Sequence, residues 1–183
     1  VSDPNYLYVT NSSDLMVTKD GGDNWISISE GLPVEPITRI AISKNDPERV
    51  WITLGGLSEG EKVYYSETAG QQWQNISAGL PNVPVNCIVH QRNSENQLYV
   101  GNDIGVFQRK DGDPEWQLFS NNLPSVIINE LEIHEASGKL RAATFGRGIW
   151  EVETIFSAVE PLVINGFEAD INTIQEGERV NFS

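Results

Sequence analysis

The chain has 183 residues, with 12 Lys and Arg against 26 Asp and Glu, so its formal net charge is -14. This charge repels phosphate backbones and argues against nucleic acid as a partner. No apolar run approaches the ~20 residues that span a bilayer, so no membrane span is predicted. Residues 1–4 (VSDP) lack the basic start and apolar run of a signal peptide. Because the chain also opens in the middle of a repeat, we expect its natural N-terminus to lie upstream.

Three segments of the chain are repeats of one another. They are residues 18–25 (TKDGGDNW), 66–73 (SETAGQQW) and 109–116 (RKDGDPEW). Their tryptophans are 73−25 = 48 and 116−73 = 43 residues apart, and each is followed at the same offset by Gly-Leu-Pro or Asn-Leu-Pro. A register that holds over whole units identifies a true repeat.

Each unit predicts four short strands. The first strands cover residues 37–43, 85–90 and 127–134, and the second follow polar turns within residues 3–10, 46–53, 94–101 and 137–144. The third cover residues 15–18, 63–66, 105–108 and 148–151, and the fourth begin at the tryptophans, covering residues 25–29, 73–77 and 116–120. Short β-branched and aromatic runs between tight turns, repeated every ~40–50 residues, are typical of a propeller blade.

The predicted fold is therefore all-β, with about three and a half blades of four antiparallel strands over residues 1–156. Closing a ring takes at least about four blades, so we expect either upstream blades or a second copy to complete it. Aromatic and apolar side chains recur at two repeat positions and are predicted to form the core between blades. These are Tyr8, Trp51 and Tyr99 at one position, and Met16, Tyr64, Phe107 and Trp150 at the other.

The three tryptophan segments resemble the Asp-box, or BNR repeat, with the pattern Ser/Thr-x-Asp-x-Gly-x-x-Trp. The resemblance implies that Asp and Gly shape a turn between the third and fourth strands and that Trp packs on the blade. The implied structural residues are Asp20, Gly22, Trp25, Gly70, Trp73, Asp111 and Trp116. Thr68 replaces Asp in the second box and Asp113 replaces Gly in the third, so looser turns are expected there. Because a packed indole is a core residue, we expect Trp25→Ala to cost about 3–5 kcal/mol.

Asp-boxes occur in sialidases, xyloglucanase-type hydrolases and sortilin-type receptors, on the outer rim and away from the ligand site. They therefore indicate architecture and not reaction. Together with residues 143–150 (ATFGRGIW), the strands of residues 2–153 most resemble the closing blades of sortilin-like propellers in secreted bacterial proteins. The three arginines that a sialidase needs to hold a carboxylate cannot be assigned.

The composition changes at Glu160. Residues 160–170 (EPLVINGFEAD) and 173–183 (TIQEGERVNFS) resemble the first two strands of a PKD-type immunoglobulin-like domain. Such a β-sandwich needs roughly 80–100 residues. Residues 157–183 are thus predicted to be a linker and the N-terminal strands of a domain that the sequence truncates.

Few residues have the types and spacing of a catalytic or binding site. The candidates for a central channel are Glu130 and Glu132 on the last inner strand, with Arg39 and Asn86 taken as repeat equivalents of Glu130. A glycoside hydrolase would use two carboxylates ~5–9.5 Å apart. The favoured interpretation is instead a solvated polar channel in which Arg39 compensates Glu130.

The remaining candidates for reactive or metal-binding groups are two histidines and one cysteine. His90 and His134 share a repeat position and are predicted to lie in surface or turn positions, because a metal pair would need a third ligand. Cys87 lies in an apolar strand and is predicted to be a buried, inert thiol. No metal and no cofactor are predicted.

The sequence thus predicts a non-catalytic binding or scaffold module of a large secreted or cell-surface bacterial protein. A glycan or an extracellular protein is the expected partner, besides the remaining blades of the parent chain. The alternative is the C-terminal portion of a xyloglucanase-like propeller glycoside hydrolase whose catalytic carboxylates lie outside this chain.

Overall fold

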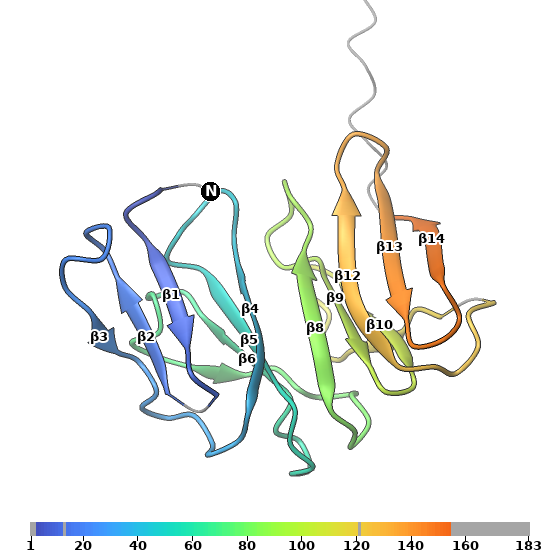
Figure 1. Cartoon of the computed structure of the whole chain (residues 1–183), viewed down its shortest axis with the longest axis horizontal. Helices are drawn as coiled ribbons and strands as arrows, with labels where there is room; N and C mark the ends of the chain where they lie inside the picture. Colours follow the sequence, from blue (N-terminus) through green and yellow to red (C-terminus); the bar gives the residue numbers. More distant parts are fainter. Residues whose placement is uncertain (1–2, 13, 121, 155–183) are drawn as a thin grey trace, which may run out of the picture.

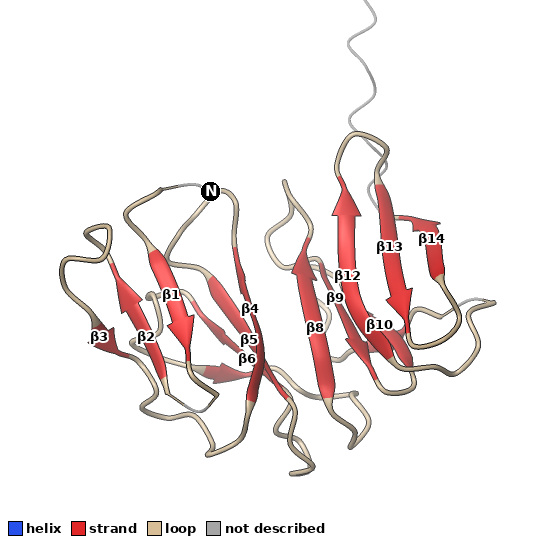
Figure 2. Ribbon diagram, in the orientation of Figure 1, coloured by secondary structure: helices blue, strands red, loops and turns tan. Residues whose placement is uncertain are grey.

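The computed structural model describes residues 3–12, 14–120 and 122–154. The predicted PKD-type strands of residues 157–183 lie outside this part. Every regular element described is a β-strand, which confirms the predicted all-β class (Figure 2). Within the described ranges no helix has the length and apolarity needed to cross a membrane.

The strands form four antiparallel sheets, which we call blades 1 to 4 (Figure 1). Blade 1 contains β1 (Leu7–Thr10), β2 (Leu15–Thr18) and β3 (Ile26–Ser27). Blade 2 contains β4 (Ile37–Ile42), β5 (Val50–Leu54), β6 (Val63–Ser66) and β7 (Gln74–Asn75). Blade 3 contains β8 (Val85–His90), β9 (Leu98–Asn102), β10 (Gly105–Arg109) and β11 (Gln117–Leu118). Blade 4 contains β12 (Ile128–His134), β13 (Lys139–Thr144) and β14 (Ile149–Glu153).

Strands follow one another across each blade in chain order, so neighbouring strands are joined by hairpins. β4, β8 and β12 are the first strands of blades 2, 3 and 4, and they lie next to one another as the innermost strands (Figure 1). The predicted first, second and third strands are present within one or two residues of their expected ends.

The fourth strands are shorter than predicted, at two residues each. The cause is a serine four residues after each tryptophan. The hydroxyl oxygens of Ser29, Ser77 and Ser120 accept hydrogen bonds from the backbone N–H groups of Leu15, Val63 and Val106, at 2.8, 2.9 and 2.8 Å. A side chain thus replaces main-chain pairing at this point and ends the ladder.

Each inner strand carries a register shift at the same repeat position. The shifts fall between Ile37 and Arg39, between Val85 and Cys87, and between Ile128 and Glu130. One residue per strand is therefore bulged out of the ladder, and in blades 2 and 3 its side chain reaches the next blade.

The core is divided into three apolar clusters, one between each pair of successive blades. Trp51, Tyr99, Tyr64 and Phe107 are all buried within them, which confirms their predicted place in the core. The prediction was wrong for Trp150, which is 38% exposed on β14. No strand covers β14 in the described part of the chain.

Candidate functional site

The inner strands bring Arg39 and Glu130 together. Their side chains form an ion pair although the residues lie on blades 2 and 4. Lys44 and Glu135 repeat this arrangement at the end of the same strands, with Nζ 2.7 Å from Oε1. Equivalent residues of blades 2 and 4 therefore carry opposite charges, and both ion pairs bridge past the inner strand of blade 3.

Asn86 occupies a different place from the one predicted. The register shift shows that the equivalents of Glu130 are Arg39 and Cys87, which pair with equivalent residues of their second strands. Asn86 is the bulged residue itself and corresponds to Thr38. The spacing of the tryptophans, 48 and 43 residues, already relates Arg39 to Cys87 and Cys87 to Glu130, so the predicted equivalence of Asn86 was one residue off the repeat register.

The bulged residues connect successive blades. Thr38 Oγ1 donates to the carbonyl oxygen of Val85 at 2.5 Å, and Asn86 Nδ2 donates to that of Ile128 at 3.2 Å. Each acceptor is the first residue of the next inner strand. Asn86 Nδ2 also lies 3.0 Å from Asp103 Oδ1. These bonds hold the inner edges of the blades together.

Glu132 is exposed on β12, two residues beyond Glu130. Since Glu130 is bound to a guanidinium, the two glutamates are not a pair of equally free carboxylates. The inner strands therefore present a row of polar groups that are mostly engaged between blades.

The histidines differ from each other. His90 is only 7% exposed and its ring stacks on Trp51 at 4.6 Å between centroids, so its predicted surface position was wrong. Burial lowers the pKa of His90, because the charged imidazolium is poorly solvated there. His134 is half-buried and its Nδ1 lies 2.7 Å from Ser137 Oγ. In the described ranges no cluster of three His, Cys, Asp or Glu has the arrangement of a metal site.

Cys87 is fully buried, as predicted. Burial raises the pKa of its thiol to about 12. The thiolate is the nucleophilic form of cysteine, so this thiol is unreactive in the folded chain.

Lys62 is a buried charged residue that the sequence does not reveal. Its Nζ donates to the carbonyl oxygen of Gly56 at 2.7 Å. Burial lowers the pKa of Lys62, and the nearby Glu35 carboxylate opposes that shift. The contact fastens the loop between β5 and β6 to its own blade.

The side chain of Asp20 organises the first tryptophan turn. Asp20 Oδ1 accepts hydrogen bonds from Asn24 N at 2.9 Å and from Thr18 Oγ1 at 2.7 Å. These bonds stabilise the ionised carboxylate and lower the pKa of Asp20 to about 2. Gly22 has a φ of 110°, which an L-residue rarely adopts.

The second and third turns use other groups. Thr68 Oγ1 accepts from Gln72 N at 3.1 Å and so makes the bond that Asp20 makes in the first turn. Asp111 instead accepts hydrogen bonds from Glu95 N, at 3.2 Å, and from Asn96 N, in the turn before β9. Its role is to join two neighbouring turns of blade 3.

The tryptophans contact the preceding blade. Trp73 Nε1 donates to Ile28 O at 2.8 Å, and Trp116 Nε1 donates to Ile76 O at 2.6 Å. Trp25 is 39% exposed and its Nε1 donates to Gly22 O of its own turn at 3.1 Å. The prediction that Trp25 is a core residue was wrong, because the described chain has no blade before blade 1 to cover this indole.

The chain resembles known proteins in structure but not detectably in sequence. No protein family matches the chain, and no curated protein matches its sequence. Among solved structures, YCF48 bound to D1 peptide superposes with a TM-score of 0.61 at 19% identity, over 85% of this chain and 50% of that one. The fold is that of a β-propeller.

Two other propeller structures from bacteria are similar. The GH74 enzyme of Niastella koreensis matches with a TM-score of 0.62 at 13% identity, over 82% of this chain. The extracellular domain of a putative hybrid two-component system of B. thetaiotaomicron matches with a TM-score of 0.63 at 16% identity, over 84% of this chain. The chain spans only 27% and 20% of the lengths of these two proteins.

Proposed function

We propose that this chain is a non-catalytic binding or scaffold module of a large secreted or cell-surface bacterial protein. We further propose that its tryptophan turns are Asp-boxes of the sortilin-like type and that a PKD-type domain follows the blades. A glycan or an extracellular protein is the partner that fits this role.

The observation that carries the proposal is the bonding of the inner polar row. Glu130 is bound to Arg39 from blade 2, and Asn86 is bound to Ile128 O and Asp103. A general acid or nucleophile has to meet substrate with its carboxyl group. A carboxylate that holds a guanidinium from another blade is better suited to fixing the blades relative to one another.

The neighbours support a location outside the cell. They include the extracellular domain of a B. thetaiotaomicron two-component system and PorZ, a bacterial surface component of a type-IX secretion system. The structure of YCF48 was solved with a bound peptide, which supports polypeptide as well as glycan as a ligand class.

The alternative function is that of the C-terminal portion of a xyloglucanase-like glycoside hydrolase. It is favoured by the likeness to GH74 enzymes, one of them the GH74 xyloglucanase of Xanthomonas campestris, which matches 80% of this chain with a TM-score of 0.59. In that case the catalytic carboxylates lie on parts of the protein outside residues 1–183.

The test is a hydrolysis assay of the full-length protein on xyloglucan and other β-glucans, together with a glycan-array binding assay. The proposal expects binding without turnover. Turnover of any glucan by the full-length protein would reject it in favour of the alternative.

If turnover occurs, matched variants locate its source. Glu130→Gln and Arg39→Gln break the same ion pair, but only the first removes a carboxylate. Equal rates in both variants place the chemistry elsewhere in the protein. A loss confined to Glu130→Gln would instead show that the inner glutamate is catalytic.

A further inference from the structure

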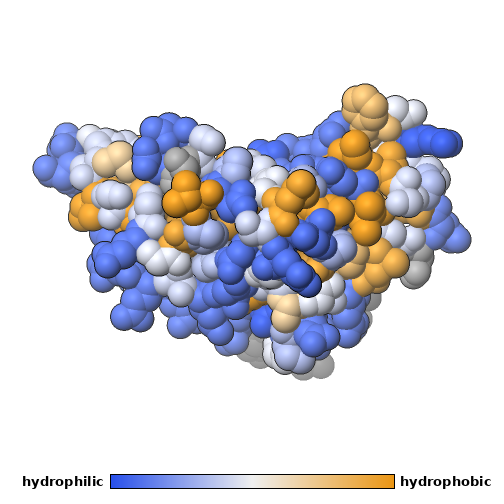
Figure 3. Space-filling view, turned by 90° about the horizontal axis from the view of Figure 1, so that it is seen from below, coloured by the Kyte–Doolittle hydropathy of each residue, from blue (hydrophilic) through white to orange (hydrophobic). Residues whose placement is uncertain are grey.

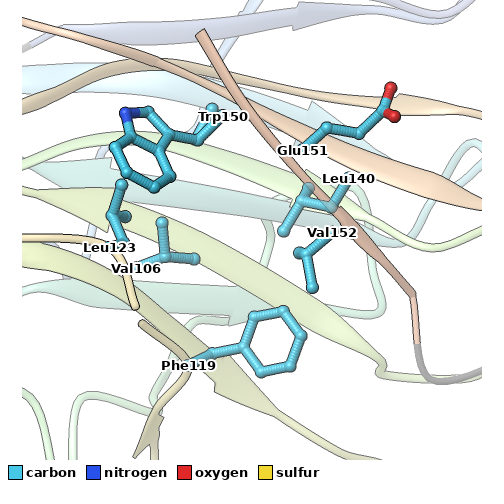
Figure 4. A pocket seen from close by; sticks show the side chains of 8 residues that line it. Val106, Phe119, Leu123, Leu140, Trp150, Glu151 and Val152 are labelled. Atoms are coloured by element: carbon cyan, nitrogen blue, oxygen red, sulfur yellow. The ribbon is translucent and has the colours of Figure 1, made fainter. Parts of the chain in front are cut away.

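An apolar pocket opens between blades 3 and 4, near their outer strands (Figure 4). Blade 3 contributes Val106, Phe119 and Leu123 to its walls, and blade 4 contributes Leu140, Ala142 and Trp150. Figure 4 shows that Val106, Phe119, Leu123, Leu140 and Trp150 surround a common space, whereas the carboxylate of Glu151 is directed away from it. Apolar side chains also gather over this end of the surface in Figure 3.

The same space is filled by an indole at the other two blade interfaces. Trp73 inserts between blades 1 and 2, and Trp116 inserts between blades 2 and 3. In both cases the indole N–H donates to a carbonyl of the preceding blade, that of Ile28 or Ile76. The repeat places the carbonyl of Phe119 at this position in blade 3, because Phe119 N bonds to Val106 O as Ile28 N and Ile76 N bond to their third strands.

Six of the eight residues that line the pocket correspond to residues of the apolar cluster around Trp116, while Glu151 and Val152 correspond to Gln108 and Arg109. In the repeat register, the six wall residues take the places of Val63, Ile76, Leu80, Leu98, Val100 and Phe107. All six of these counterparts belong to the apolar cluster that contains Trp116 or pack against it. The pocket is therefore the equivalent of a tryptophan site, with its walls already in place.

Blade 4 also has an open edge beside the pocket. In blades 1 to 3 the residues directly after the tryptophan form the outermost strand. Within the described part of blade 4 no strand pairs with the outer edge of β14, and all five of its residues are exposed. An edge with free main-chain groups accepts an extended segment as an additional strand.

We propose that this pocket is a tryptophan slot. It binds the indole of an extended polypeptide segment that pairs with β14 as the fourth strand of blade 4. The segment has the pattern Trp-x-x-apolar, as in the chain's own fourth strands (WISI, WQNI and WQLF). The inference does not rest on the proposed function, since the slot lies apart from the inner polar row.

The segment comes from outside residues 1–183. The chain has five tryptophans, and all five belong to blades 1 to 4. Trp25, Trp73 and Trp116 already precede fourth strands, Trp51 is fully buried between blades 2 and 3, and Trp150 is part of the slot wall. Residues 151–183 contain phenylalanine but no tryptophan.

The experiment titrates the 183-residue chain into a fluorescently labelled peptide with the sequence of residues 70–80 (GQQWQNISAGL) and follows anisotropy. The same peptide with alanine in place of tryptophan is the matched control. We expect saturable binding of the first peptide and at least about tenfold weaker binding of the second, since a buried indole is a typical binding hot spot.

Two variants of the chain test the location. Ala142→Phe fills the slot from blade 4, and Leu123→Glu places a charge at its wall in blade 3. Both are expected to weaken binding at least about tenfold, and Ile104→Glu, at an exposed apolar residue of the β9–β10 turn, is expected to leave it unchanged. Circular dichroism establishes which variants are folded, and either folded slot variant suffices. No binding by the wild-type chain, equal binding of the two peptides, or full binding by a folded slot variant would overturn the proposal.

Discussion

Removing single tryptophans tests whether these residues stabilise the chain by packing on the preceding blade. Trp116→Ala removes an indole that is 3% exposed and that donates to Ile76 O. Trp25→Ala removes the equivalent indole of blade 1, which is 39% exposed and bonded only within its own turn. The two changes are chemically identical and differ only in whether a blade lies against the ring.

The structure sets their expected sizes. Truncating a buried tryptophan costs about 3–5 kcal/mol, and leaving the Ile76 carbonyl without a partner adds about 1 kcal/mol. Trp25→Ala removes only the partial contact of this indole with its own blade. We therefore expect it to lower the free energy of unfolding by about 1 kcal/mol, the typical effect of a point mutation. The free energies of unfolding of the two variants should therefore differ by at least about 2 kcal/mol.

The measurement is urea unfolding of the 183-residue chain, followed by far-UV circular dichroism and extrapolated to water. Trp116→Phe is a useful third variant, because it keeps an aromatic ring in the site and removes the N–H donor. Its cost should be about 1 kcal/mol. Equal destabilisation by Trp25→Ala and Trp116→Ala would refute the reasoning that burial of these indoles comes from the preceding blade.

Three further predictions concern single residues. Asp20→Ala should lower the unfolding midpoint at pH 7, whereas Asp23→Ala should not. Because the pKa of Asp20 is lowered to about 2, the stabilisation from its carboxylate is present above pH ~4 and disappears as the pH falls toward 2. The free energy of unfolding of Asp20→Ala should therefore change less between about pH 4 and pH 2 than that of the wild-type chain. Cys87 should resist a thiol reagent at pH 8 in the folded chain and react fully in denaturant, since its pKa is raised to about 12; fast labelling of the folded chain would contradict this. Gly101→Ala should destabilise the chain by about 1–3 kcal/mol in denaturant titrations, because a Cβ there would lie 2.5 Å from Ile128 Cγ2. An unchanged free energy of unfolding would mean that Ile128 can move to accommodate the methyl group.

Much of the fold could be predicted from the sequence because the repeated segments are similar enough to align. Aligning the three tryptophans fixes the order of strands, and β-branched residues between polar turns locate them. The fourth strands were predicted too long because alternation continues past their hydrogen-bonded part. The serine four residues after each tryptophan is the signal that ends them, through its bond to the third strand.

The candidate site was harder to predict because it depends on contacts between blades. Arg39 and Glu130 are 91 residues apart, and their pairing was expected only from opposite charge at one repeat position. Asn86 was predicted one residue away from the register that the tryptophan spacing sets, in which Cys87 is the equivalent of Arg39 and Glu130. Whether Trp25 is buried depends on the neighbouring blade, which the local motif does not report.

The outward face of blade 4 differs chemically from those of the other blades. At the position where blades 1 to 3 carry Tyr8, Trp51 and Tyr99, blade 4 carries Arg141, whose Nε lies 2.9 Å from Glu151 on the adjacent strand. Lys139 Nζ lies 2.6 Å from the same carboxylate. An apolar blade packed here would bury these charges, and the desolvation of ion pairs is costly even when they stay paired. Any surface that meets this face must therefore be polar, whereas the slot on the opposite face of the same blade is apolar.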